Sequence, residues 1–164
     1  MKALGIDVGL IVCGYVLCQV EGLTIDLIKQ GQIIPNPKHA LPQKLNCIFD
    51  GLSEEIAQYN PEAIIVEKLY SHHRHPTTLG VLAQVRGVVG LLAYQKELGF
   101  FEYSSTRARK SFLGKGSANS EQVKKMAENV TGEKFKSIHV ADAFSLVVAF
   151  SHAQKFKRIL RDSV

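Results

Sequence analysis

The chain has 164 residues, of which 46% are hydrophobic and 21% are charged, so it is long enough to bury the core of one soluble domain. Its formal net charge of +5 is uneven: residues 1–70 carry five Lys and Arg against eight Asp and Glu, whereas residues 71–164 carry fifteen against seven. A basic second half beside an acid-bearing first half is typical of a protein that binds a polyanion and holds cations at the contact. A solvated basic surface is the alternative interpretation.

Composition also excludes several classes of protein. No apolar run approaches the roughly 18 residues of a membrane span. The three cysteines offer neither a disulfide framework nor a zinc-type Cys-x-x-Cys pair. We therefore expect a cytoplasmic protein with no membrane partner.

Residues 3–9 form an apolar run with one carboxylate, Asp7, near its end and a glycine on either side of that acid. This pattern predicts a buried strand that stops at a turn. An ionised carboxylate is costly to bury without a partner, and a metal cation is a common one; a cap on the turn is the alternative use of Asp7. Residues 12–20 and 23–34 follow as strands with short connections, which predicts an antiparallel meander.

A second acid ends a second apolar run. Apolar residues recur every three or four positions over residues 41–59, which predicts an amphipathic helix. Residues 63–67 are then almost wholly apolar and end in Glu67. A strand that is apolar on both faces belongs in the middle of a sheet. Each of the two predicted central strands therefore ends in an acidic residue, at the point where its apolar run stops.

Residues 71–76 contain three histidines, and we interpret them as a solvated loop rather than a zinc site. Residues 77–98 predict a long helix, although it contains Gly80, Gly87 and Gly90, each of which costs roughly 1 kcal/mol relative to Ala. Close packing explains such a cost, either at a dimer seam or within an ordinary core helix. Residues 100–103 predict a short strand.

The following segment, residues 104–117, carries four Lys and Arg and no acid. Basic side chains and exposed backbone N–H groups near its glycines suit a nucleic-acid backbone. Asn119 or Ser120 can cap a short helix to about Asn129. The last helix is expected over residues 138–157, with His139 and Asp142 on one face.

A two-metal phosphodiesterase needs a set of ligands of this kind. One carboxylate bridges two cations, and others complete each oxygen shell while leaving positions for water and phosphate. Asp7, Glu67, His139 and Asp142 fit that need.

At this point the chain resembles the RuvC Holliday-junction resolvases, of the ribonuclease H-like superfamily. The matching motifs occur in the family's order over residues 3–152: Gly5-Ile6-Asp7-x-Gly9 with Gly14-Tyr15, Val66-Glu67 with Tyr70, Gln84-x-Arg86-Gly87, Glu102-Tyr103, Gly114-x-Gly116-Ser117-Ala118 with Gln122-Val123, and Ala141-Asp142-Ala143.

The resemblance implies an α/β, ribonuclease H-like fold, with a five-stranded mixed sheet (three antiparallel strands, then two parallel) flanked by helices. We expect a nuclease domain over residues 1–155 and a basic C-terminal tail over 156–164. The implied activity is resolution of four-way DNA junctions by paired symmetric nicks in recombination and repair. It further implies a homodimer, two Mg²⁺ ions per active site with Mn²⁺ also supporting activity, and a branch-migration motor as partner.

The resemblance also assigns roles to residues. Asp7 would bridge the metals, Glu67 would complete one site, and His139 with Asp142 would hold the other. Tyr70 would stack on bases near the junction centre. Phosphate contacts are expected from five basic residues: Arg74, Arg107, Arg109, Lys110 and Lys115.

Three positions depart from the family pattern. Val8 stands where Pro is frequent, and His139 stands where many members have Asp. A histidine ligand must be neutral to bind, so metal affinity should fall at low pH, and it favours Mn²⁺ beside Mg²⁺. Ser120 stands where many members have a lysine; either Lys115 substitutes for that lysine, or strand grip and turnover are weaker. The alternative functions are a nuclease for another branched DNA and a junction-binding protein with impaired catalysis.

Overall fold

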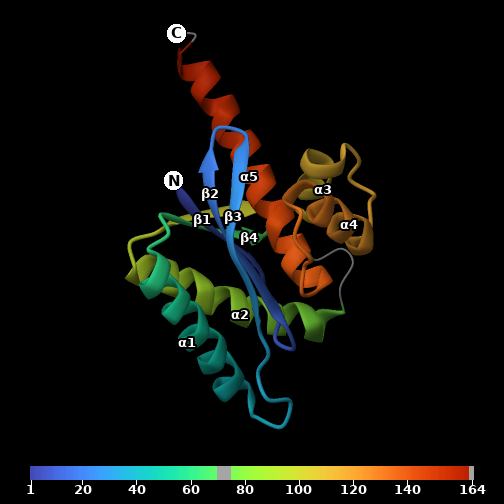
Figure 1. Cartoon of the computed structure of the whole chain (residues 1–164). Helices are drawn as coiled ribbons and strands as arrows, with labels where there is room; N and C mark the ends of the chain where they lie inside the picture. The colour runs from blue at the N-terminus through green and yellow to red at the C-terminus, as the bar shows by residue number, and fades with distance from the viewer. Residues whose placement is uncertain (70–74, 163–164) are drawn as a thin grey trace.

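The structure is a computed structural model that describes residues 1–69 and 75–162. Three strands, a helix, a strand, a helix, a strand and then helices follow one another along the chain, in the order expected from the sequence (Figure 1). They are β1 (Lys2–Asp7), β2 (Cys13–Glu21), β3 (Thr24–Ile33), α1 (Leu41–Tyr59), β4 (Ala63–Glu67), α2 (Pro76–Gln95), β5 (Gly99–Tyr103), α3 (Ser105–Leu113), α4 (Ser120–Thr131) and α5 (Ile138–Asp162).

The strands form one five-stranded mixed sheet in the order β3-β2-β1-β4-β5. The pairs β1–β2 and β2–β3 are antiparallel, whereas β1–β4 and β4–β5 are parallel, which confirms the predicted fold class. Ile6 on β1 is in register with Val66 on β4. The next residue of each strand is an acid, so Asp7 and Glu67 stand side by side at the carboxyl ends of the two central strands.

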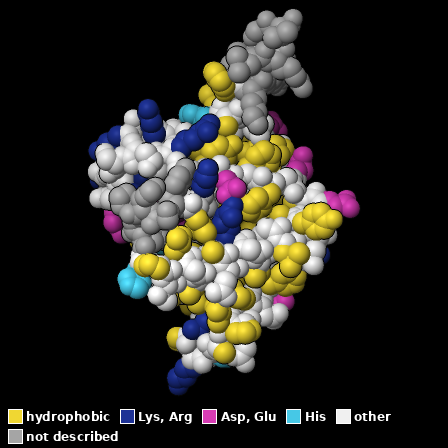
Figure 2. Space-filling model, turned by 180° about the vertical axis from the view of Figure 1, so that it is seen from behind, with side chains coloured by type: hydrophobic (Ala, Val, Ile, Leu, Met, Phe, Trp, Pro, Cys, Tyr) yellow, Lys and Arg dark blue, Asp and Glu magenta, His cyan; other side chains and the backbone are white. Residues whose placement is uncertain are grey.

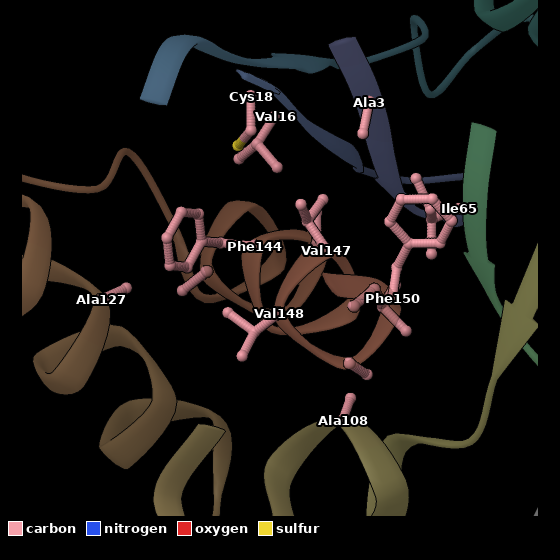
Figure 3. Packing of buried hydrophobic residues seen from close by; sticks show 14 of the residues in the cluster. Ala3, Val16, Cys18, Ile65, Ala108, Ala127, Phe144, Val147, Val148 and Phe150 are labelled. Atoms are coloured by element: carbon pink, nitrogen blue, oxygen red, sulfur yellow. The ribbon is translucent and has the colours of Figure 1, made fainter. Parts of the chain in front are cut away.

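Each face of the sheet carries its own apolar core. Helices α1 and α2 cover one face, where Ile48, Leu52 and Val85 pack against residues such as Leu4 and Ile64. Helix α5 covers the other face, and α3 and α4 pack on its outer side. Figure 3 shows α5 between the strands and these two helices, with Val147 and Phe150 turned toward the sheet. Because α5 is surrounded on both sides, most of its residues from Val140 to Phe150 are buried.

Helix α5 approaches the sheet at two glycines. A Cβ on Gly5 would lie 2.5 Å from the carbonyl oxygen of Ala143, and a Cβ on Gly14 would lie 2.6 Å from the carbonyl carbon of His139. Real side chains do not fit at such distances from backbone atoms. Gly14 pairs with Asp7 across β1 and β2. Because Gly14 has no side chain, the first turn of α5 can lie directly beside the end of β1.

Several helices differ from their sequence-based bounds. Helix α2 ends at Gln95 rather than at residue 98, and α4 ends at Thr131 rather than at Asn129. The basic composition of residues 104–117 predicts a phosphate-binding segment but no particular secondary structure, and Ser105–Leu113 forms α3. Its start is fixed by the Ser104 side chain, which accepts a hydrogen bond from the backbone N–H of Arg107, and its end by Gly114 at φ 77°. Helix α5 continues to Asp162, beyond the expected Lys157. The division into a domain over residues 1–155 and a tail over 156–164 stays a prediction.

Two of the three glycines of α2, Gly80 and Gly87, are not explained by packing among the described residues. No described atom lies within 4 Å of a Cβ built on Gly80 or Gly87. By length and composition alone α2 is apolar enough to cross a membrane, with a mean hydropathy of 1.3 over the best window. Its buried residues, including Val85 and Val89, belong to the core between α1 and the sheet. The apolar character of α2 therefore has a structural role in this fold.

We predict that Gly14→Ala lowers the free energy of unfolding by about 1–3 kcal/mol, the range typical of overpacking, because the new methyl group collides with the α5 backbone. Gln58→Ala is the control, because Gln58 is an exposed residue of α1 and alanine favours a helix. Urea denaturation of both variants measures the effect. Equal stability of Gly14→Ala and the unsubstituted protein would contradict the close approach of α5.

Candidate active site

The four predicted ligand residues line one cleft of about 790 Å³. Asp7 and Glu67 come from the carboxyl ends of β1 and β4, and His139 and Asp142 come from the start of α5. The cleft is completed by the β1–β2 turn, the start of α2 and parts of α3 and α4. Its remaining lining residues are Val8, Gly9, Leu10, Ile11, Val12, Thr77, Thr78, Val81, Leu82, Ser105, Arg109, Ser120 and Ile138.

Asp7 and His139 are in direct contact. The His139 Nδ1 atom lies 2.8 Å from Oδ2 of Asp7. The Asp7 side chain is only 16% exposed, whereas that of His139 is 42% exposed and faces the cleft. The hydrogen bond to Asp7 raises the pKa of His139 above its ordinary value, against the opposing effect of burial. Helix α5 therefore supplies, through His139, the hydrogen-bond partner that the partly buried Asp7 carboxylate requires.

Asp142 is held from the other side of the cleft. The Ser120 hydroxyl donates to Oδ2 of Asp142 over 2.6 Å, and Nη2 of Arg109 lies 3.6 Å from Oδ1. Burial raises the pKa of Asp142, and the negative charge of Asp7 raises it further; Ser120, Arg109 and His139 act in the opposite direction. A cation bound near both carboxylates would stabilise the negative charge of each.

The donor set fits hard divalent cations, because carboxylate oxygens and one imidazole meet in the same cleft. Within the described residues, no three His, Cys, Asp or Glu side chains form a group arranged as a metal site. His139 is hydrogen-bonded to Asp7, and Ser120 to Asp142. A cation held by Asp7 and His139 together would replace the hydrogen bond between them.

The predicted phosphate-binding residues have different environments. The Arg107 guanidinium lies 5.0 Å from the centre of the Tyr103 ring, and its side chain is exposed. Lys110 and Lys115 are exposed but do not line the cleft. Arg109 points inward, to Ser120 and Asp142. Seen from behind, Lys and Arg side chains gather on the side of α3 and α4, and hydrophobic side chains lie across the middle (Figure 2).

Tyr70, Arg74 and most of the histidine-rich segment lie outside the described residues. His75 is described and immediately precedes α2. The proposed base and phosphate contacts of Tyr70 and Arg74 stay predictions.

Two features of the site, and one contact outside the cleft, were not predicted from the sequence. Ser120 contacts Asp142, although the sequence indicates only a missing lysine there. Ile11, in the β1–β2 turn, is 81% exposed and gives the cleft an apolar edge. Arg86 on α2 forms an ion pair with Glu102 on β5. The only signal for Ser120 is its place directly after the Asn119 helix cap, which fixes where its side chain starts.

Comparisons with known proteins identify the family of this chain. The sequence model of the family described as crossover junction endodeoxyribonuclease RuvC matches residues 3–152. The RuvC of Alkaliphilus metalliredigens is 32% identical over 163 residues, which cover 98% of this chain and 99% of that protein. The RuvC of Trichlorobacter lovleyi is 34% identical over 158 residues, which cover 96% and 87%.

Solved structures share the fold. Thermus thermophilus RuvC in complex with Holliday junction substrate superposes with a TM-score of 0.87 at 22% identity, covering 96% of each chain. The yeast mitochondrial Holliday junction resolvase superposes with a TM-score of 0.65 at 14% identity, covering 93% of this chain and 78% of that one. With a family match over nearly its whole length, close relatives of the same name and a shared fold, this chain belongs to the RuvC family of crossover junction endodeoxyribonucleases.

Proposed function

We propose that this protein is an endonuclease that resolves four-way DNA junctions by metal-dependent hydrolysis of phosphodiester bonds. The observation that carries the proposal is the convergence of Asp7, Glu67, His139 and Asp142 on one cleft. Family membership supplies the substrate, because the relatives named above are crossover junction endodeoxyribonucleases. The expected products are two nicks at symmetry-related positions of the junction.

The four ligand residues would hold two divalent cations. Asp7 stands between Glu67 on the neighbouring strand and His139 on α5, which supports its proposed role as the ligand shared by both cations. The cations, when bound, would make a water molecule more acidic and neutralise charge on the phosphate. We propose Mg²⁺ because most of the donors are carboxylate oxygens, and Mn²⁺ as a second activator because one donor is imidazole.

Junction binding would use the basic side of the molecule. Lys110 and Lys115 are exposed near the cleft-forming helices α3 and α4, and Arg107 is exposed beside Tyr103. These side chains are free to reach phosphates, so binding should weaken steeply with salt. The apolar edge at Ile11 lies at the same cleft and suits a deoxyribose or base rather than a phosphate.

We further propose that the protein acts as a homodimer through the exposed face of α2. That face combines glycines, at which an added Cβ meets no described atom within 4 Å, with large exposed apolar side chains. Leu91 is 54% exposed and Tyr94 is 82% exposed. Small residues beside exposed apolar ones allow two helices to approach closely. Two copies would present two cleavage sites, as paired nicks require.

The cellular setting follows from the family resemblance. We propose a cytoplasmic location, where chromosomal junctions are accessible in bacteria, and a branch-migration motor as the partner that moves the junction. Both can be tested by co-purification from cells.

Asp7→Asn should abolish cleavage of a labelled four-way junction and leave junction binding in EDTA nearly unchanged. The amide keeps the shape of the carboxylate and can still accept from His139, but it removes the charge that would bind cations. Asp26→Asn, at an exposed position on β3, is the control and should cleave normally. Loss of binding together with cleavage would contradict a catalytic role for Asp7.

Leu91→Glu should shift the protein from dimer to monomer in sedimentation velocity, because it places a charge in the proposed α2 interface. Ile28→Glu changes an isoleucine that is also exposed, at 43%, but lies on the edge strand β3, and it should leave the dimer intact. A monomeric unsubstituted protein, or dissociation by both variants alike, would contradict the interface.

A further inference from the structure

The Arg109 side chain is engaged by the protein itself. Its Nη1 donates to the carbonyl oxygen of Ala118 over 2.8 Å, and its Nη2 donates to the Ser120 Oγ over 3.0 Å. The side chain is only 25% exposed. This geometry differs from that of Lys110, the next residue of α3, whose side chain is exposed. Arg109 therefore donates hydrogen bonds within the protein and does not point outward toward a phosphate.

The donor and the acceptor are fixed in each hydrogen bond that links Arg109 to Ser120 and Ser120 to Asp142. A guanidinium group can only donate, so the Ser120 oxygen must accept from Arg109. The single hydroxyl proton of Ser120 is then directed at Oδ2 of Asp142, 2.6 Å away. A short hydrogen bond to an ionised carboxylate is among the stronger kinds. Arg109 thus orients the Ser120 hydroxyl, and this hydroxyl in turn orients the Oδ2 atom of Asp142.

The backbone around Ser120 is itself held in place. Asn119 and Gln122 form a capping box, in which each side chain accepts from the backbone N–H of the other residue. Gly116 lies against α3, where an added Cβ would lie 2.6 Å from the Thr106 side chain. The segment between α3 and α4 therefore brings Ala118 and Ser120 to Arg109 with little freedom to move.

We propose that Arg109 and Ser120 are positioning residues that orient the Asp142 carboxylate for cation binding. The inference rests on the proposed function, because it concerns the same site. It replaces the phosphate contact that the sequence predicts for Arg109. It also gives a role to Ser120, which stands where the family pattern has a lysine. Groups that hold a ligand side chain typically change metal affinity by 10–100-fold when removed.

The first test measures cation binding without activity. Protein stripped of metal with EDTA is titrated with Mn²⁺ by isothermal calorimetry. Ser120→Ala should weaken binding about 10-fold, and Ser120→Thr, which keeps the hydroxyl, should bind within about 2-fold of the unsubstituted protein. Ser117→Ala removes an exposed hydroxyl three residues away and is the control. Thermal unfolding in EDTA checks that each variant is folded.

The outcomes separate the two proposals. Unchanged affinity in Ser120→Ala, or equal losses in Ser120→Ala and Ser120→Thr, would overturn the positioning role while leaving the proposed function intact. Absence of Mn²⁺ binding by the unsubstituted protein would overturn the proposed function, and this inference with it.

The second test concerns Arg109 and DNA. Junction binding is measured in EDTA over a range of salt concentrations for Arg109→Ala and Lys110→Ala. One lost phosphate contact reduces the slope of log K against log salt by about 0.9. We expect that reduction for Lys110→Ala and an unchanged slope for Arg109→Ala. A slope reduced by about 0.9 for Arg109→Ala would show that Arg109 contacts a phosphate, and it would overturn the positioning role proposed for this residue.

Discussion

The close contact between α5 and the central strands is the constraint on which the site depends. Gly5 and Gly14 leave no side chain between the helix and the sheet, so the backbone at Ala143 and His139 can rest directly on β1 and β2. From Val140 to Phe150, α5 is enclosed by the sheet on one side and by α3 and α4 on the other. The helix can be surrounded in this way because its residues between Val140 and Phe150 are mostly small or apolar. Its first turn is thereby fixed against the end of β1.

The chemistry of the cleft follows from that packing. Gathering acids in a partly buried cleft costs free energy, since each charge disfavours ionisation of the next. The protein offsets this cost with neighbouring donors: His139 bonds to Asp7, and Ser120 bonds to Asp142. Arg109 stands behind Ser120 and adds a positive charge near Asp142. These donors hold the carboxylates of Asp7 and Asp142 in the cleft, and they come from three different helices.

Much of this could be predicted from the sequence, because local patterns carry it. Apolar runs that end in Asp7 and Glu67 locate the two central strands, and helical periodicity gives α1 the bounds observed. The fold class was predicted correctly through the resemblance. The orientation of Arg109 could not be predicted, since it depends on how α3, α4 and α5 pack together. Helix α3 was missed because basic side chains obscure its short apolar face, of which only Ala108 is buried.

The most direct test incubates the protein with a labelled four-way junction and a linear duplex of the same sequence, in Mg²⁺, in Mn²⁺ and in EDTA. The account predicts paired nicks at symmetry-related positions of the junction alone, in either metal, and none in EDTA. Cleavage of the duplex at a similar rate, cleavage that persists in EDTA, or an intact junction in both metals would contradict it.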